Sequence, residues 1–118
     1  MAAIYIKRIY EPAEKSDGLR ILVDRLWPRG LKKENAHIDA WTKDIAPSTT
    51  LRKWFDHDPK KWQEFIARYT SELETTDGLE KFLELIQDHE TVTMLYAAHD
   101  EEHNHALVLQ QLLTQLNR

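Results

Sequence analysis

The sequence predicts an α/β fold, a single three-layer domain over residues 1–118 in which helices flank a small, mainly parallel β-sheet. Two apolar runs, residues 21–23 and 92–96, are typical of strands buried in a sheet, and we expect them to be parallel neighbours. Stretches with helical spacing of apolar residues lie between and after them, and such alternation favours parallel pairing. The 118 residues, 42% of them hydrophobic, are enough to bury one core.

The start of the chain predicts two strands joined by a loop. Residues 3–9, "AIYIKRI", mix apolar and polar side chains in alternation, as a half-exposed strand near a sheet edge does. Residues 11–18 are rich in turn formers. The run 21–23 is continuously aliphatic, which indicates a strand covered on both faces, and Pro28 and Gly30 end it.

The middle of the chain predicts shorter elements. Residues 31–47 indicate one helical turn followed by a short extended segment around residues 38–41. Ser48 is placed to cap a short helix, and Asp58 followed by Pro59 is a helix start with proline at the first helical position.

Two longer helices follow these segments. The first carries an apolar stripe at helical spacing, formed by Trp62, Phe65, Ile66, Tyr69 and Leu73. Asp77 with Glu80 three residues later resembles a capping box that opens the second. The stripe of this second helix is formed by Leu79, Phe82, Leu83 and Ile86.

The last third of the chain predicts a central strand and a final helix. The strand is "TVTMLYAA", residues 91–98, and the helix runs from about residue 102 to residue 116. The residues expected to be buried in this helix are Ala106, Leu109, Leu113 and Leu116. Those expected to face solvent are Gln110, Gln111, Thr114 and Gln115.

Composition excludes several kinds of chemistry. The chain has no cysteine, which rules out disulfides, a thiolate nucleophile and zinc sites with sulfur ligands. The opening "MAAIYIKRIY" is interrupted by Lys7 and Arg8 after a few apolar residues, which is too short for a signal or membrane-spanning segment. We therefore expect a cytoplasmic protein with no membrane partner.

Charge is distributed unevenly along the chain. Residues 1–61 hold 13 of the 16 Lys and Arg against 9 Asp and Glu, whereas residues 62–118 hold 3 against 11. A nucleic-acid-binding protein is usually basic as a whole, so the net charge of −4 argues against that class. The acidic half is typical of solvated helix faces, and the basic half requires another explanation.

Two charged stretches follow the predicted buried strands. Residues 24–30 leave one strand and residues 99–105 leave the other, which leads directly into the final helix. Ligands of parallel α/β sheets bind beyond the carboxyl ends of the strands, and a helix N-terminus favours an anion. We therefore expect both stretches to line one ligand-binding cleft.

Arginines are the candidate ligand-binding residues of this cleft. Arg25, Arg29 and Arg52 carry planar guanidinium groups that suit phosphate or carboxylate, and we expect all three to converge. If the strand continues through residue 25, Asp24 and Arg25 point to opposite faces, and an ion pair elsewhere is the structural alternative for each. Trp27 is either a lid over the core or a stacking platform.

Histidines are the candidates for proton transfer. His105, or Asp24, is placed to act as an acid or base, because histidine titrates nearest neutral pH. His99 and His103 share this window, but only these two lie one helical turn apart, and we predict no metal site. Nothing in the sequence identifies a cofactor. We expect the side chain of Asn104 to bond backbone groups or a residue across the cleft.

Three stretches together carry a resemblance to a known family. "LVDRLWPRG", "APSTTLRKWF" and "LYAAHDEEHNHALVL" resemble the YeaO-like proteins, small bacterial proteins catalogued as a domain of unknown function, DUF488, and the match spans nearly the whole chain. The motif positions that the resemblance implies are Asp24, Arg25, Trp27, Pro28, Arg29, Gly30, Pro47, Ser48, Leu51, Arg52, Asn104, His105 and Ala106. More distant members of the wider family look to have a cysteine-histidine-arginine run after the last strand. Here that place reads His103, Asn104 and His105, so a cysteine mechanism does not carry over.

Three functional hypotheses remain open from the sequence. The first is an enzyme for a small anionic substrate, with Asp24 or His105 moving a proton. The second is a binding module for a nucleotide or single-stranded nucleic acid, with Trp27 or Trp54 stacking beside the arginines. The third is a scaffold in which the charged motifs are structural. The residues predicted to contact a ligand are Arg25, Trp27, Arg29, Ser48, Arg52 and Asn104.

Overall fold

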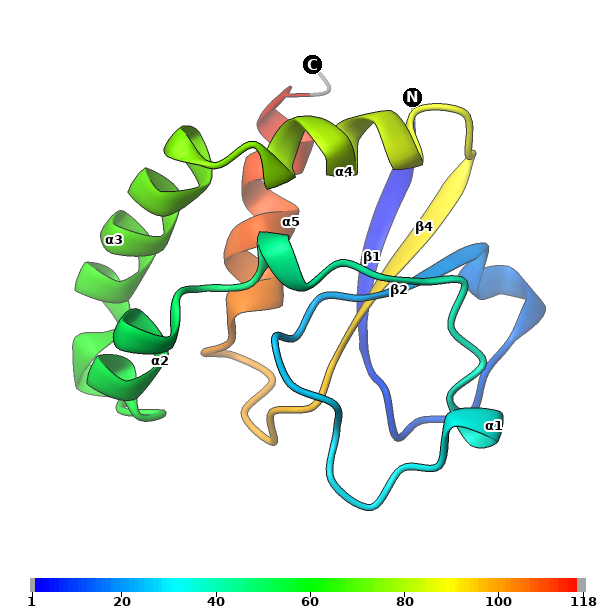
Figure 1. Cartoon of the computed structure of the whole chain (residues 1–118), viewed down its shortest axis with the longest axis horizontal. Helices are drawn as coiled ribbons and strands as arrows, with labels where there is room; N and C mark the ends of the chain where they lie inside the picture. The colour runs from blue at the N-terminus through cyan, green and yellow to red at the C-terminus, as the bar shows by residue number, and fades with distance from the viewer. Residues whose placement is uncertain (1, 117–118) are drawn as a thin grey trace.

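A four-stranded parallel sheet forms the centre of the protein, whose computed structural model describes residues 2–116 (Figure 1). The strands are β1 (Ala3–Arg8), β2 (Leu19–Leu22), β3 (Ala40–Trp41) and β4 (Thr91–Tyr96). The helices are α1 (Lys33–Ala36), α2 (Thr49–Phe55), α3 (Trp62–Thr75), α4 (Gly78–Ile86) and α5 (His105–Leu116), with short 3₁₀ turns η1 (Lys15–Asp17), η2 (Lys43–Ile45) and η3 (Pro59–Lys61). The order across the sheet is β1-β4-β2-β3, and every pair is parallel. This confirms the α/β class, the edge position of the first strand and the pairing of the two buried runs.

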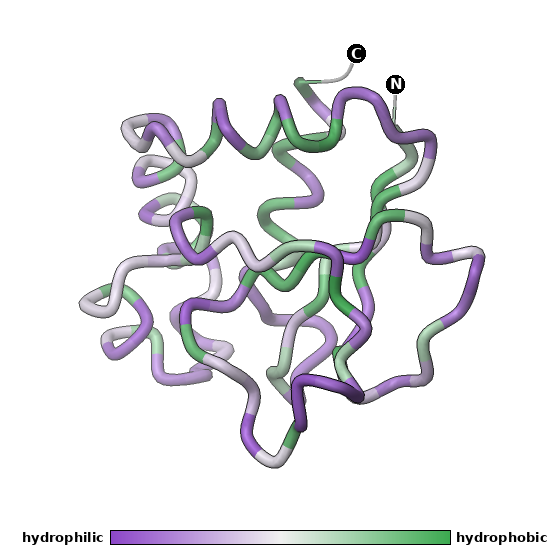
Figure 2. The backbone as a smooth tube through the Cα atoms, turned by 45° about the vertical axis from the view of Figure 1, so that its right-hand side comes forward, coloured by the Kyte–Doolittle hydropathy of each residue, from purple (hydrophilic) through white to green (hydrophobic). Residues whose placement is uncertain are grey.

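Side chains alternate between the two faces of the sheet and build a separate core on each. Ile21 and Met94 belong to the larger core, which α2, α3, α4 and α5 cover. Leu22 and Leu95 belong to a smaller core on the opposite face, closed by α1 and by the loop after β2. The result is the predicted three-layer arrangement. Figure 2 shows the hydrophobic stretches of the backbone gathered toward the middle, with hydrophilic stretches prominent in the outer loops.

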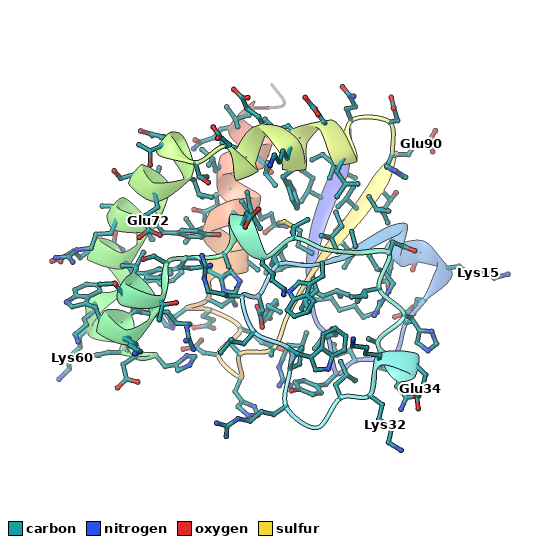
Figure 3. All side chains as sticks on the ribbon, in the orientation of Figure 1. Lys15, Lys32, Glu34, Lys60, Glu72 and Glu90 are labelled. Carbon is teal, nitrogen blue, oxygen red and sulfur yellow. The ribbon has the colours of Figure 1, made fainter. Side chains whose placement is uncertain are left out.

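The longer helices bury the stripes that their spacing predicts. Phe65, Tyr69 and Leu73 of α3 are buried, as are Phe82 and Ile86 of α4. Both helices therefore fold as amphipathic elements against the larger core. Outside these two helices, Lys15, Lys32 and Lys60 project away from the fold into solvent (Figure 3).

The start of α4 differs from the prediction. Asp77 has helical dihedral angles, φ −70° and ψ −17°, and its side chain caps no N–H group. A capping box requires extended geometry at the capping residue, so the predicted Asp77–Glu80 box is wrong. The hydroxyl of Thr76 accepts the N–H of Gly78 instead, at 3.2 Å.

The ends of α5 also differ from the prediction. The helix begins at His105 because a carboxylate oxygen of Asp100 accepts the N–H groups of both Glu102 and His103 and holds these residues in a turn. Leu116, predicted to be buried, is 51% exposed because the helix runs past the core at that end. Gln110, predicted to face solvent, is half-buried and donates a hydrogen bond to the carbonyl of Ile4 at 2.8 Å.

A buried ionic cluster fastens the loop after β1 to the sheet. The carboxylate of Asp17 accepts hydrogen bonds from Lys7 at 3.2 Å, from Arg20 and from the N–H of Glu14. The hydroxyl of Thr93 donates to the carbonyl of Asp17 at 2.7 Å. Burial opposes the charge of this carboxylate, but the bonds from Glu14, Lys7 and Arg20 outweigh burial and lower the pKa of Asp17.

Gly18 allows this loop to approach the sheet closely. Its φ is +63°, and a β-carbon at this position would lie 2.2 Å from the carbonyl oxygen of Thr91. Both the dihedral angle and the close contact therefore require glycine.

Candidate functional site

A cleft of about 1080 Å³ opens at the carboxyl edge of the sheet. Its walls come from the segments that follow β1, β2 and β4, from α2, and from the residues that lead into α5. Because all four strands are parallel, these segments meet at one edge although they are far apart in the sequence. The cleft lies where the sequence predicts a ligand site.

Four arginines line this arginine cleft, namely Arg8, Arg25, Arg29 and Arg52. Arg25 donates from Nε to the carbonyl of Pro47 at 3.1 Å and from Nη2 to the carbonyl of Ala46 at 3.2 Å. Arg8 donates in the same manner to the carbonyls of Ala98 and Ala97, at 2.9 and 3.2 Å. Both guanidinium groups are thus held by neutral acceptors. The side chains of Arg29 and Arg52 are exposed at the cleft.

The charges of these arginines are not neutralised by neighbouring carboxylates. Within residues 2–116, none of the four makes an ion pair with an acidic side chain. Two acidic residues, Asp24 and Asp100, line the same cleft. The arginine cleft therefore concentrates positive charge in a protein whose net charge is −4.

Asp24 and His105 form a close pair at the junction of β2 and α5. One carboxylate oxygen of Asp24 accepts the N–H of Ala97 at 3.0 Å, which joins the ends of β2 and β4. Nε2 of His105 lies 3.1 Å from the other oxygen, Oδ1, and 3.1 Å from the carbonyl oxygen of Val23. The hydrogen-bond angle favours Val23, so Oδ1 is a buried oxygen without a hydrogen bond from the described residues, despite its short distance to the imidazole.

A second acid–histidine pair precedes α5. Nδ1 of His103 lies 3.0 Å from Oδ2 of Asp100, and the imidazole packs edge-on against Trp62 with ring centroids 5.4 Å apart. The N–H of Glu102 and the contacts with His103 lower the pKa of Asp100 below its usual range, which favours the ionised form of this carboxylate.

Asn104 bonds backbone at both ends of its amide, as predicted. Its Nδ2 donates to the carbonyl of Asp100 at 3.0 Å, and its Oδ1 accepts the N–H of Leu107 at 3.0 Å. The side chain is buried and caps α5. It therefore orders the approach to the helix beside the cleft.

Aromatic side chains form part of the cleft wall. Trp27 donates from Nε1 to the carbonyl of Leu31 at 2.7 Å and packs edge-on against Trp41, with centroids 5.4 Å apart. These contacts correspond to the lid interpretation of Trp27, which is partly buried and packs against the smaller core. Tyr10 donates its hydroxyl to the carbonyl of Arg29 at 2.8 Å.

The structure brings most of the sequence-predicted site residues together. The cleft is lined by Asp24, Arg25, Trp27, Arg29, Arg52, Asn104 and His105. Ser48 lies outside it and caps α2 by accepting the N–H of Leu51 at 3.1 Å, while its hydroxyl donates to Glu72 of α3 at 2.6 Å. Trp54 also lies outside, in a smaller groove between α2 and α3, with Arg68 packed over its ring.

Sequence reasoning missed Arg8, Tyr10 and His57 as lining residues. Arg8 is the last residue of β1, and the rule that located Asp24 at the end of its strand applies equally to it. His57 has a positive φ of 56° in the turn after α2, a backbone state that periodicity does not signal.

Two negative findings concern the residues that the structure describes. No three His, Asp or Glu side chains among residues 2–116 are grouped so that they could share a metal ion. None of the described helices is both long and apolar enough to cross a membrane.

Comparisons with known proteins identify relatives along nearly the whole chain. Residues 3–118 match the family described as the inactive DUF488-N3 subclade. The chain is 47% identical over 113 residues to the uncharacterized protein YeaO of Escherichia coli, covering 96% of this chain and 98% of that protein. It is 39% identical over 110 residues to the uncharacterized protein Rv3073c of Mycobacterium tuberculosis, covering 93% and 92%. No solved structure matches it.

Proposed function

Because this chain belongs to the inactive DUF488-N3 subclade of YeaO-like proteins, we propose that it binds a small anion bearing phosphate or carboxylate in the arginine cleft without covalent catalysis. The observation that carries this proposal is the gathering of four arginines and two aspartates around one cleft, with the arginines free of carboxylate partners among the described residues. Guanidinium groups in this state repel one another, and an anion between them relieves the repulsion.

Binding is favoured over turnover by the chemistry of the cleft. The chain has no cysteine, and Ser48 is engaged with Glu72 outside the cleft. An enzyme built on the same residues would use Asp24 and His105 to move a proton. In the binding proposal this pair instead joins β2 to α5 beside the anion. We further propose that the whole chain acts as one domain in the cytoplasm, which accords with its lack of cysteine.

Thermal unfolding with and without inorganic phosphate or sulfate tests the proposal. A ligand at one hundred times its dissociation constant stabilises the folded state by about 2.7 kcal/mol, which corresponds to a rise in Tm on the order of 10 °C for a domain of this size. Arg29→Gln and Arg52→Gln should reduce this rise and leave Tm without phosphate unchanged or higher, because both side chains are exposed and each substitution removes one of the repelling charges. Arg68→Gln is the matched control, since Arg68 is exposed outside the cleft.

Other results would support the alternatives. Arg25→Gln should lower stability as well as the phosphate effect, because its guanidinium holds Ala46 and Pro47. The scaffold hypothesis would be favoured by two results together. Arg25→Gln would lower the free energy of unfolding by about 3 kcal/mol or more, and phosphate would raise Tm neither in the wild type nor in any variant. Salt-sensitive binding of single-stranded oligonucleotides without a response to phosphate would favour the nucleic-acid hypothesis.

A further inference from the structure

The rim of the arginine cleft carries apolar side chains that face solvent. Leu26 is 58% exposed and Tyr10 is 42% exposed, and both line the cleft. Among the described residues the other exposed large hydrophobic side chains are Tyr5 and Leu116, which lie elsewhere. Half of this set is therefore gathered at one opening. Single exposed apolar residues are common, but two on the rim of a cationic cleft form a combined surface.

The aromatic residues of the cleft offer it their rings rather than their polar atoms. The hydroxyl of Tyr10 is bonded to the carbonyl of Arg29, and the indole N–H of Trp27 is bonded to the carbonyl of Leu31. The N–H and O–H donors of both side chains are thus already used within the protein. What these residues have left for a ligand is mainly ring surface.

The apolar rim and the positive charge are adjacent. The guanidinium carbon of Arg8 lies 5.1 Å from the centre of the Tyr10 ring, and Arg29 follows two residues after Trp27. Deeper in the cleft, the buried rings of Phe55 and Phe65 continue the apolar lining. A bound anion would therefore have apolar surface beside it.

We infer that the ligand is an amphiphilic anion, in which a phosphate or carboxylate is joined to an aromatic or aliphatic group. This inference rests on the proposed function and adds the class of ligand to it. The arginines bind the charged group, while the apolar group covers Leu26 and Tyr10 and removes their surface from water. A fully hydrophilic anion would leave that surface exposed and gain less.

Calorimetric titration with two phosphate monoesters tests the inference. Methyl phosphate and phenyl phosphate share a head group, but only the second carries a large apolar group. We expect phenyl phosphate to bind at least about tenfold more tightly. Equal affinities would overturn the inference and leave the proposed function standing. Failure of both esters, and of acetate and benzoate titrated in the same way, to bind would overturn the proposed function and the inference with it.

A pair of variants ties this preference to the rim. Leu26→Ser should lower the phenyl-over-methyl affinity ratio by about threefold or more, and it should fold because Leu26 is largely exposed. Leu116→Ser is the matched control, since Leu116 is 51% exposed at the end of α5 and lines no part of the cleft. An unchanged ratio in Leu26→Ser, or an equal fall in Leu116→Ser, would overturn the assignment of the apolar contact to the rim.

Discussion

Asp17 is the residue on which the loop after β1 depends. Its carboxylate has two cationic partners, Lys7 and Arg20, and the side chains of all three residues are largely withdrawn from water. Removal of the carboxylate would leave buried Arg20 without a counter-charge and Lys7 with only the exposed Glu14, which is more costly than the loss of a surface ion pair.

We expect Asp17→Asn to lower the free energy of unfolding by about 3 kcal/mol at pH 7. The matched control is Glu14→Gln, which removes the exposed partner of Lys7 and should cost less than about 1 kcal/mol. Urea unfolding at pH 7 measures both values. Equal effects of the two substitutions would show that the buried cluster contributes no more than a surface pair.

The same residue predicts a pH dependence. Because the pKa of Asp17 is lower in the folded state than in the unfolded chain, its stabilisation is fully present above the unfolded value, about 3.9, and is lost as pH falls through the folded value. The free energy of unfolding of the wild type should therefore fall below about pH 4 more steeply than that of Asp17→Asn. Parallel pH profiles for the two proteins would contradict this account.

At the scale of elements, α5 depends on a cap that lies outside its regular turns. Asn104 satisfies the N–H of Leu107 and binds the carbonyl of Asp100, so it links the helix to the turn that precedes it. Asn104→Ala should lower stability by about 1–2 kcal/mol, measured by thermal or urea unfolding. Asn35→Ala, at an exposed position of α1, is the control and should change stability little.

Phosphate binding by the same variant shows whether Asn104 stabilises the backbone beside the cleft or contacts the ligand. If Asn104 only stabilises the backbone, Asn104→Ala should retain a phosphate-induced rise in Tm from a lower starting value. Unchanged stability together with a lost phosphate response would instead place Asn104 among the ligand contacts.

Local spacing predicted most elements because each longer helix has an apolar face that only a helical period explains. The stripes of α3 and α4 are examples. The cap of α2 by Ser48 was predicted in a different way, from the residue type at the start of the helix. Spacing failed where two local arrangements compete. The residues before α5 have helical spacing, but Asp100 takes the N–H groups of Glu102 and His103 into a turn and delays the helix. Leu116 has the same helical spacing as the buried residues of α5, but it lies beyond the edge of the core and is exposed.

At the scale of the whole molecule, the sequence located the cleft through one rule about parallel strands. Asp24 and His105 were expected together because each follows a predicted strand, and the structure places Nε2 of His105 3.1 Å from Oδ1 of Asp24. The order of strands was not contained in any local pattern, because it depends on which faces of the whole sheet the helices cover. Tyr10 was missed for that reason, since its place beside the cleft follows from the pairing of β1 with β4. Arg8, in contrast, ends a predicted strand, and the same rule about strand ends applies to it.

The strand order predicts a hierarchy of hydrogen exchange. β4 is paired on both sides, by β1 and by β2, and Val92–Tyr96 are all buried. Its amides should exchange on the order of a hundredfold more slowly than those of β3, a two-residue edge strand. Residue-resolved hydrogen–deuterium exchange measures this ratio. Similar rates in the two strands would mean that the sheet opens as a single unit.

The position of β4 has a consequence for how the chain is made. β1 pairs with β4 alone, and β2 pairs with β4 and with the two-residue β3. Until residues 91–96 have left the ribosome, β1 therefore has no neighbour in the sheet and β2 has only β3. Until then the apolar residues of both strands are without the sheet that buries them, a state in which chaperones bind and aggregation begins. Ala3 must then find Thr91 across most of the chain, which is a slow and entropically costly closure. The arginine cleft, whose parts follow β1, β2 and β4, is consequently among the last features of the protein to form.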